Sequence, residues 1–589
     1  MRNPFYTPVR RNHVVGPAGV GSLLVTRSGI TALMCGLPMW LNSAPSRGAD
    51  ELAKRADRAR LLETYELHDS NVEQDLGISR LISPPVIDDD AAYGLTWFIP
   101  SIRFPLAEYC HNPACKTLGT ASPESPGVGR CLRCDSKRPT RAQQVPVVLV
   151  CPTGHLDEVD WMHLVHPTGT CNQNTVLTYN MGNYVMAPEI TCKSCGKKER
   201  LDPKVLVPCT GARPWLPGFK YEKCGEHMTV LDRTSTAVYF PDVRSYLHIP
   251  AQPNLRDAVL RWLENEPSVH ALRQVPARAG SPEILKRAQL MFPDLDTDSL
   301  TLHLDHLELG SQGPAGREGE FAALAEGVRG VRTSDGPPVL DSQIMNAAEY
   351  AHGLVGDNYL ISKVVAVHRI AETRALAGFS RIEPPSRVAV GASGFQLLWG
   401  LKAGVDPTHD WLPGMRVYGE GVLVELDQSR VERWASQARG QLKETMLQGE
   451  QLKVEFQLAH TFAHLFMNAA ALSCGYPIAS LRDRIYVTDE HTAFLVYTGE
   501  GDAMGTLGGL VDLARPGQFE KVIQIALANA RWCGLDPVCI EPVHHIRHDK
   551  AGACHQCCLL PETSCGWWNE ALDRATLIGR GSLTGYLDM

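Results

Sequence analysis

The 589-residue sequence predicts a multidomain α+β protein, with zinc-ribbon-like β modules in its N-terminal half and a mixed α/β C-terminal lobe that has its own zinc site. Closely spaced cysteine pairs recur through the first half and again near the end, which is the spacing of structural zinc ligands. The chain is several times longer than a usual domain, and its clearest helical periodicity lies in the second half. These observations predict an N-terminal α+β lobe over 1–105, a zinc-ribbon region over 106–250, a helical connector with a flexible loop over 251–345, and a C-terminal domain over 346–589.

Each segment is justified by its local pattern. The first combines short strands and turns with a helical stretch around Glu51–Leu67. The second interleaves cysteines with short β-rich runs, which bury too little apolar surface to be stable without a metal. The third is helical in pattern between Pro253 and Asp341, and Gly310–Gly319 is expected to form its flexible loop. The fourth contains an amphipathic helix over Arg430–Gly449 and a more apolar helix over Leu452–Leu472.

Composition restricts the class of protein. The formal net charge of −8 and a pI of about 6.2 give no overall basic signature, so nucleic-acid contacts must use local patches. No apolar run approaches the roughly 20 residues needed to span a bilayer, and the first residues do not resemble a signal peptide. We therefore expect a soluble, cytoplasmic protein in which the clustered cysteine pairs, among 18 cysteines in all, are metal ligands rather than disulfide partners.

Two four-thiolate sites are expected in the second segment. Cys110-x4-Cys115 and Cys131-x2-Cys134 are separated by a loop of zinc-ribbon length. The pair Cys192-x2-Cys195, which is followed by a turn-forming glycine, matches most naturally with Cys209 and Cys224. Four thiolates fill a tetrahedral shell and leave no position for water, so such sites are structural.

Two further sites leave alternatives open. Cys151, His155, His166 and Cys171 form a possible mixed site, for which the alternative is a helix-capping turn and one buried histidine. Near the C-terminus, Cys554, Cys557 and Cys565 need a fourth ligand; Cys539 is the best candidate, and Cys533 and Cys558 are substitutes. The sequence therefore predicts two to four structural zinc ions.

A histidine pair raises the question of catalysis. His460 and His464 lie four residues apart on a predicted helix, so both rings face the same way. We favour a buried helix face, because Thr461 replaces the acidic residue of a zinc-protease helix. The alternative function is a metal-dependent nuclease or hydrolase that uses this pair with a carboxylate such as Glu420 or Asp489. No phosphate-binding loop with its lysine accompanies the helicase-like segment around Asp489, so we expect no ATPase and no enzymatic activity in this chain.

Several long motifs carry a resemblance to a known family. These motifs span residues 99–105, 151–161, 209–216 and 238–250 in the N-terminal half, and 368–382, 411–426, 460–487, 505–511 and 554–575 in the C-terminal lobe. On these motifs the N-terminal half is similar to the DrmB family of DISARM, a bacterial anti-phage defence system, and the C-terminal lobe resembles the MrfA-like zinc-binding domain found with superfamily 2 helicases. Cys110-x4-Cys115 is wider than the family's usual C-x-x-C pair.

The resemblance implies a role and partners. DrmB-like proteins act beside DrmA, a superfamily 2 helicase, so the chain is expected to form a heterodimer with a DrmA-like motor and to help bind or gate DNA. The DNA-contact candidates from the sequence itself are Lys193, Lys197, Lys198 and Arg200. Trp161 and Trp215 are candidates for stacking on bases, with a place in the core as the alternative. A pure protein scaffold that never touches DNA is the remaining hypothesis.

Overall fold

The computed structural model divides the chain into two compact units, each built from segments that are not consecutive in sequence. Unit 1 comprises Met1–Ser245 and Arg374–Met415, and unit 2 comprises Tyr246–Thr373 and Arg416–Met589. The division falls inside the strands β19 (Phe240–Leu247), β21 (Ile361–Ser380) and β22 (Trp411–Leu426), so it does not follow the four consecutive segments expected from the sequence, which stay a prediction. The structure describes residues 5–6, 9, 11–26, 28–43, 65–67, 69–84, 99–125, 127–131, 133–134, 140–169, 171, 175–182, 184–218, 220–248, 259, 262, 281–293, 297, 300–301, 316–328, 339–385, 393–400, 410–442, 445–447, 450–499, 508–541, 552–561 and 564–589.

Unit 1 is a set of small antiparallel sheets with short helices. The sheet orders are β1-β6-β3-β2, β8-β7-β9, β11-β10-β18-β15, β12-β13-β14 and β16-β17. Most of these strands have two to four residues, so each sheet has little surface with which to form a core. The strands are β1 (Phe5–Tyr6), β2 (Leu23–Val25), β3 (Thr31–Met34), β4 (Glu66–Leu67), β5 (Arg80–Ile82), β6 (Pro100–Arg103), β7 (Ala107–Cys110), β8 (Leu118–Thr120), β9 (Ala142–Gln144), β10 (Val147–Val150), β11 (Leu156–Asp157), β12 (Leu177–Asn180), β13 (Glu189–Cys192), β14 (Lys198–Arg200), β15 (Leu206–Pro208), β16 (Ala212–Arg213), β17 (Lys220–Tyr221), β18 (His227–Asp232) and β19 (Phe240–Leu247).

Buried polar contacts join parts of unit 1 that are distant in sequence. The fully buried guanidinium of Arg381 donates to the carbonyl oxygens of Gly154, at 2.8 Å, and Gly21, at 2.9 Å, and also to that of Val238. Strand β5 pairs in parallel with the start of β22 through Arg80–Ile82. The helices are α1 (Arg11–Val14), α2 (Leu37–Ser43), α4 (Ser70–Leu76), α5 (Trp161–Val165) and α11 (Ser393–Trp399).

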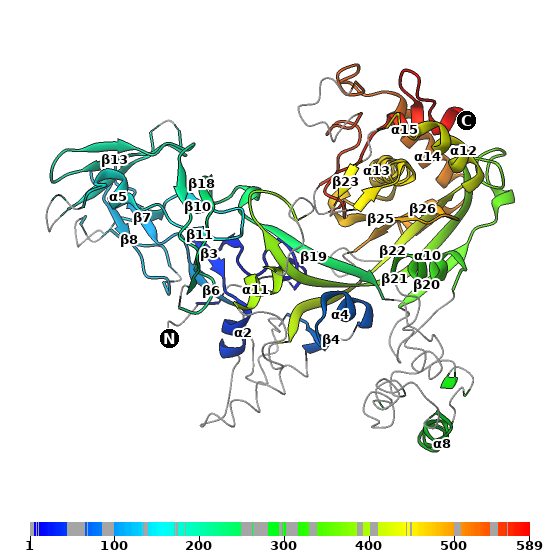
Figure 1. The fold of residues 1–589 in the computed structure, drawn as a ribbon, viewed down its shortest axis with the longest axis horizontal. Coiled ribbons are helices and arrows are strands. Elements are labelled where there is room, and N and C mark those ends of the chain that lie inside the picture. Colours follow the sequence, from blue (N-terminus) through cyan, green and yellow to red (C-terminus); the bar gives the residue numbers. More distant parts are fainter. Residues whose placement is uncertain are drawn as a thin grey trace. The chain divides into compact units, whose positions relative to one another are not determined.

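Unit 2 is built around an antiparallel sheet that is covered on both faces. On strand β22, which pairs with β26, Val422 and Val424 lie in one hydrophobic cluster, and Leu423 between them lies in another. The period of two in a strand places these clusters on opposite faces. Helices α13 and α14 cover one face (Figure 1), and α10 packs against the other. The elements are α8 (Ser281–Met291), α10 (Gly316–Ala325), β20 (Leu340–Ile344), β21 (Ile361–Ser380), β22 (Trp411–Leu426), α12 (Gln428–Ala438), β23 (Thr445–Leu447), β24 (Glu450–Leu452), α13 (Val454–Cys474), β25 (Leu481–Val487), β26 (Thr492–Thr498), α14 (Gln518–Arg531) and α15 (Ala575–Ile578).

Helix α13 lies in the middle of this core. Its sequence is rich in alanine, leucine and phenylalanine, and most of its residues are buried all around the helix, as expected for a helix with neighbours on every side. It ends at Gly475, whose φ of 78° is the left-handed conformation typical of a helix C-terminus. The predicted helix over Leu452–Leu472 is thus present within two residues at each end.

Two other local predictions differ from the structure. The helix expected over Arg430–Gly449 ends at Ala438, because Gly440 adopts a φ of 85° and a β-hairpin of β23 and β24 follows. The loop expected over Gly310–Gly319 is helical from Gly316, where α10 begins. Glu320 in that helix is buried and accepts two 2.6 Å hydrogen bonds from Arg484, which anchors α10 to the sheet. Residues 310–315, and most of the helix expected over Glu51–Leu67, lie outside the described residues.

No helix in the described part of the chain is long and apolar enough to cross a membrane.

Candidate metal centres

The structure brings metal-ligand side chains together in five groups. In each group, four donor atoms lie within 4.8 Å of one another. None of the cysteines, all of which lie among the described residues, forms a disulfide. The groups are the 110–134 group (Cys110, Cys115, Cys131, Cys134), the 151–224 group (Cys151, His155, Cys209, Cys224), the 166–195 group (His166, Cys171, Cys192, Cys195), the 533–557 group (Cys533, Cys539, Cys554, Cys557) and the histidine group (His460, His464, Asp483, Cys565).

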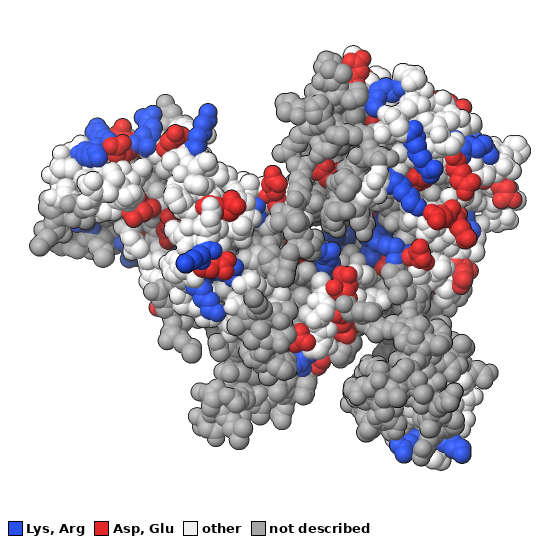
Figure 2. Space-filling model, viewed as in Figure 1, with Lys and Arg blue, Asp and Glu red and all other residues white. Residues whose placement is uncertain are grey.

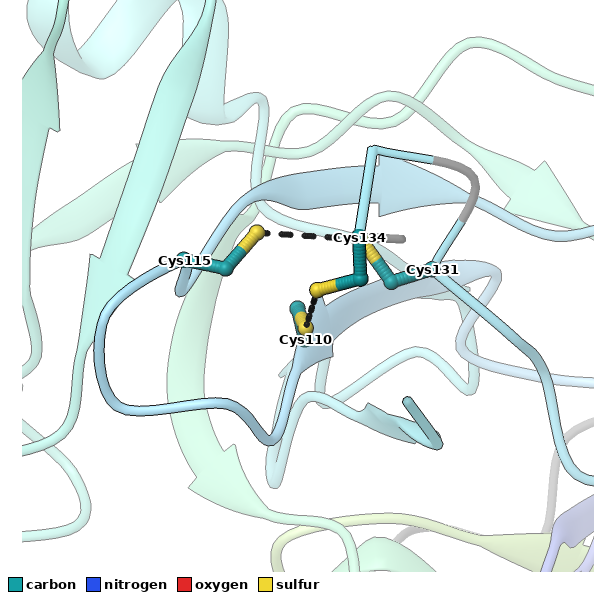
Figure 3. A group of neighbouring side chains, drawn as sticks. All are labelled: Cys110, Cys115, Cys131 and Cys134. Carbon is teal, nitrogen blue, oxygen red and sulfur yellow. Dashed lines mark hydrogen bonds between the residues drawn. The ribbon is translucent and has the colours of Figure 1, made fainter. Parts of the chain in front are cut away.

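The 110–134 group contains the four cysteines that the spacing predicted to lie together. Cys110 ends strand β7 and Cys115 follows in the next loop, while the other two come from a separate loop (Figure 3). The Sγ atoms of Cys110 and Cys134 are 3.4 Å apart, and those of Cys115 and Cys131 are 3.8 Å apart. A zinc tetrahedron with Zn–S bonds of about 2.3 Å has edges of about 3.8 Å, so this geometry suits a four-thiolate site.

The 151–224 group combines residues that the sequence analysis had placed in two different sites. Strands β10 and β15 both pair with β18, with Val150 opposite Thr229 and Pro208 opposite His227. Cys151 directly follows β10, Cys209 directly follows β15, and Cys224 precedes β18, so all three reach the same edge of one sheet. This strand order explains why Cys209 and Cys224 lie beside Cys151 and His155 and not, as expected, beside Cys192 and Cys195.

His155 is oriented as a metal ligand in this group. Its Nε2 lies 2.7 Å from Glu222 Oε1, and its Nδ1 lies 3.4 Å from the Sγ of Cys209. A carboxylate that accepts a hydrogen bond from the N–H of one imidazole nitrogen leaves the lone pair of the other nitrogen for a metal, which is the usual arrangement around ligating histidines. Arg213 in turn contacts Glu222. Burial lowers the pKa of His155, so the neutral, ligating form is favoured.

The 166–195 group contains the other ligands whose partners differ from those expected from the sequence. His166 caps the C-terminal end of α5, which packs against β13, and Cys192 ends β13. The Sγ atoms of Cys171 and Cys192 are 3.6 Å apart. The Nε2 of His166 is buried and makes no hydrogen bond to any described residue. His166 and Cys171 therefore lie with Cys192 and Cys195, instead of with Cys151 and His155 as expected.

The 533–557 group differs from the expected C-terminal site in one ligand. Cys539 lies 3.7 Å from Cys557, Cys554 lies 3.7 Å from Cys557, and Cys533 lies 3.6 Å from Cys554, all between Sγ atoms. Cys533, which the sequence offered only as a substitute, takes the place expected for Cys565. Cys565 instead lies beside helix α13, where its Sγ is 3.2 Å from the Nε2 of His460. Cys558 is fully buried and belongs to none of the groups.

Hydrogen bonds prepare one thiolate in at least two of these groups. Burial raises the pKa of the Cys115 thiol, but hydrogen bonds from the hydroxyl and backbone of Thr117 outweigh it and lower the pKa to about 6. Burial likewise raises the pKa of Cys192, and the nearby His166 imidazole, with hydrogen bonds from the backbone of Cys195 and Ser194, lowers it to about 6. The thiolate is the form that ligates metals, so each of these groups has a first ligand ready near neutral pH.

The histidine pair lies deep in unit 2. His460 and His464 are fully buried on α13 with their ring centroids 4.4 Å apart, as a buried helix face predicts. The acidic residue beside them is Asp483 of β25. Glu420 accepts hydrogen bonds from Leu510 and Tyr476, and Asp489 is exposed and paired with Lys453. Since a hydrolytic metal centre keeps a position open to water and substrate, the full burial of this pair does not favour the nuclease hypothesis.

The DNA-contact candidates lie on and around the turn between β13 and β14. Lys193, Lys197, Lys198 and Arg200 are all exposed. Lys197 lies 3.6 Å from Glu199 and Lys198 lies 3.9 Å from Glu189, so acidic neighbours reduce the local positive charge. Figure 2 shows the same mixture of basic and acidic side chains over the part of unit 1 that carries β13 in Figure 1.

The two tryptophans considered for base stacking are core residues. Trp161 is buried and packs edge-on against Tyr179 in the cluster that underlies the cysteine groups of unit 1. Trp215 is also buried, and its Nε1 donates a 2.7 Å hydrogen bond to the carbonyl of Leu397.

Asp483 is the functional candidate that sequence reasoning missed. It is a single aspartate inside strand β25, 19 residues after His464, and no spacing rule connects it to the histidines. Only the pairing of β25 with β26, which places β25 beneath α13, brings it there. Cys565 was expected in a metal site, and the structure places it in the neighbouring group.

The fold and the cysteine groups define a cysteine-rich, mixed α/β protein of two units. Residues 10–240, which include the first three groups, match a family described as a domain of unknown function, DUF8724.

The particular likeness is to DrmB. Over 527 residues the chain is 25% identical to the "DISARM protein DrmB" of Bacillus paralicheniformis, and the match covers 82% of this chain and 89% of that protein. The similarity to DrmB that the motifs predicted is thus confirmed. A solved structure described as the DUF1998 helicase MrfA bound to DNA overlaps 38% of this chain and 23% of that chain, at 12% identity and a TM-score of 0.18.

Proposed function

We propose that this chain is a non-catalytic accessory subunit of an anti-phage defence complex, which partners a DrmA-like superfamily 2 helicase and helps to bind or gate DNA. The observation that carries the proposal is the similarity to a DISARM protein along most of both chains. The motor belongs to the partner in this proposal, in keeping with a sequence that has no phosphate-binding loop of the P-loop type.

The structural part of the proposal is that zinc fills the four cysteine-rich groups. Sγ–Sγ distances of 3.4 to 3.8 Å fit the edges of a zinc tetrahedron, and each group offers at least three thiols. With four protein ligands each, these ions would hold short strands and turns in place and would not activate water. The result is a rigid platform on which a helicase and a nucleic acid can be positioned.

The DNA part rests on local charge. The exposed basic residues around the β13–β14 turn lie next to the 166–195 group, which would fix the turn that carries them. Because acidic residues flank two of these lysines, we expect a weak contribution that depends on the rest of a complex. Each phosphate contact made by such a lysine should steepen the plot of log affinity against log salt concentration by about one.

The first experiment is purification of the tagged full chain from its native host, with mass spectrometry of whatever is recovered at stoichiometric yield. A superfamily 2 helicase recovered in equal amount supports the proposal. Recovery of the chain alone, at a salt concentration where the fold is intact, would contradict the heterodimer.

A second experiment separates DNA handling from a pure scaffold. DNA affinity of the purified complex is measured against salt concentration for Lys193→Glu and for Lys521→Glu, which reverses an exposed charge on α14 in unit 2. The proposal predicts weaker binding and a shallower salt dependence for Lys193→Glu only. Equal affinities for both variants and the unaltered complex would remove this turn from the DNA path.

A further inference from the structure

The histidine group in the core of unit 2 is a metal site of different composition from the cysteine-rich groups. We propose that His460, His464, Asp483 and Cys565 together bind a fifth zinc ion, in a closed, structural shell of two imidazoles, one carboxylate and one thiolate that joins the C-terminal segment to helix α13. This inference stands on the geometry of unit 2 and does not depend on the partner or the DNA role proposed above.

The distances between donor atoms are those of a coordination shell. The Nε2 of His460 lies 3.2 Å from the Sγ of Cys565 and 3.2 Å from the Oδ2 of Asp483. The Nε2 of His464 lies 3.4 Å from the same carboxylate oxygen. For zinc bonds of about 2.0 Å to nitrogen and oxygen and about 2.3 Å to sulfur, the tetrahedral edges are about 3.3 to 3.5 Å. One ion at the centre can therefore reach all four donors.

Two of the donor atoms have no partner outside the group. The Nε2 of His464 and the Oδ2 of Asp483 are fully buried and make no hydrogen bond to any described residue beyond the group, and their near neighbours are each other and the Nε2 of His460. A buried polar atom without a partner costs on the order of 1–3 kcal/mol, and a buried carboxylate costs more. A cation at this point satisfies both atoms at once.

Outer hydrogen bonds orient three of the four ligands, His464, Asp483 and Cys565, toward one point. The Nδ1 of His464 lies 3.0 Å from the carbonyl oxygen of Cys558, so this nitrogen carries the proton and Nε2 is free to ligate. The other oxygen of Asp483, Oδ1, accepts from the backbone amide of Gly566 at 3.0 Å. The Sγ of Cys565 accepts from the amides of Trp567 and Asn569, both at 3.3 Å, as thiolate ligands commonly do.

The site is closed to solvent, which decides its role. All four side chains are buried, and the ring of Phe456 packs between His460 and Trp567, with centroid distances of 5.4 and 5.0 Å. With four protein ligands and no access for water, the ion is structural. It links α13, strand β25 and the segment that begins at Ser564, whose hydroxyl and carbonyl also bond to Ile478 and Asp483.

The test counts metal ions in the folded full-length protein by native mass spectrometry. Cys565→Ala and Cys558→Ala each remove one buried thiol, eight and one residues after Cys557, but only Cys565 belongs to a group. We expect Cys565→Ala to carry one zinc fewer than the unaltered protein and Cys558→Ala to carry the same number. Because the comparison is relative, it does not require the other four groups to be fully loaded.

A second variant separates loss of the metal from loss of the fold. Asp483→Asn has the same shape and keeps the oxygen that accepts from Gly566, but the neutral amide is a much poorer zinc ligand. We expect a folded protein with one zinc fewer. The proposal is overturned if folded Cys565→Ala and Asp483→Asn both retain the metal count of the unaltered protein, which would make the group a metal-free network of hydrogen-bonded side chains.

Discussion

Unit 1 and unit 2 place the same ligand types in opposite surroundings. In unit 1 the 166–195 group lies among strands of three or four residues, and Cys171 and Cys195 are exposed. In unit 2 the histidine group lies against a helix that is buried on all sides, within a large apolar cluster. A metal in unit 1 would reinforce a small core between short strands, whereas a metal in unit 2 would be added to a large core. The two units should therefore respond differently to loss of metal, loss of packing and change of pH.

The largest effect is expected from removing a ligand in unit 1. Cys192→Ser should lose one metal and unfold the region of β12, β13 and β14, because structural zinc contributes on the order of 10 kcal/mol to small modules that have little core. Limited proteolysis should then cut between residues 171 and 201, and native mass spectrometry should show one ion fewer. The control is Cys35→Ala, which removes a buried thiol of unit 1 that belongs to no group. If Cys192→Ser resists protease as well as Cys35→Ala does, metal is not what holds this module together.

A smaller loss of stability, without loss of metal, is expected from a truncation in the core of unit 2. Phe466→Ala on α13 removes a fully buried ring that packs against Phe494 and Phe519, and such truncations cost about 3–5 kcal/mol. Urea unfolding should show this loss while the metal count stays the same. The matched control is Leu472→Ala, an exposed residue of the same helix, which should change stability by less than about 0.5 kcal/mol. A metal ion lost from Phe466→Ala would mean that packing and metal binding in unit 2 are one cooperative feature.

The same contrast explains how much the sequence could predict. Cys110, Cys115, Cys131 and Cys134 were assigned to one group because both pairs are local and lie in adjacent loops. Helix α13 was predicted because its apolar pattern is continuous over many residues.

Groups formed by sheet topology could not be assigned in this way. The exchange of partners between the 151–224 and 166–195 groups depends on β10 and β15 both pairing with β18, which leaves no trace in cysteine spacing. Asp483 and Cys565 meet the histidines from segments 19 and 101 residues after His464, and only the packing of α13 on β25 determines that. Local spacing identified ligand types, and tertiary structure decided which ligands share a site.

The smallest expected effect is a pH dependence that belongs to unit 2. Asp573 is buried beside Arg580, with 3.0 Å between Oδ2 and Nη1, and burial raises the pKa of its carboxyl to about 6, from an ordinary value of 3.8. The folded protein therefore binds this proton more tightly than the unfolded chain does. Stability must then fall as pH rises from about 4 to about 6, by as much as roughly 3 kcal/mol.

The measurement that isolates this contribution is the difference in unfolding free energy between the unaltered protein and Asp573→Asn at several pH values. Because the amide does not titrate, the unaltered protein should lose stability relative to the variant between about pH 4 and pH 6, and the difference should be constant above about pH 7. Other carboxyls and the metal ligands titrate in both proteins and cancel in the difference. A difference that does not change across this range would show that Arg580 holds Asp573 ionised in the folded state, so that unit 2 has a buried ion pair in place of a buried acid.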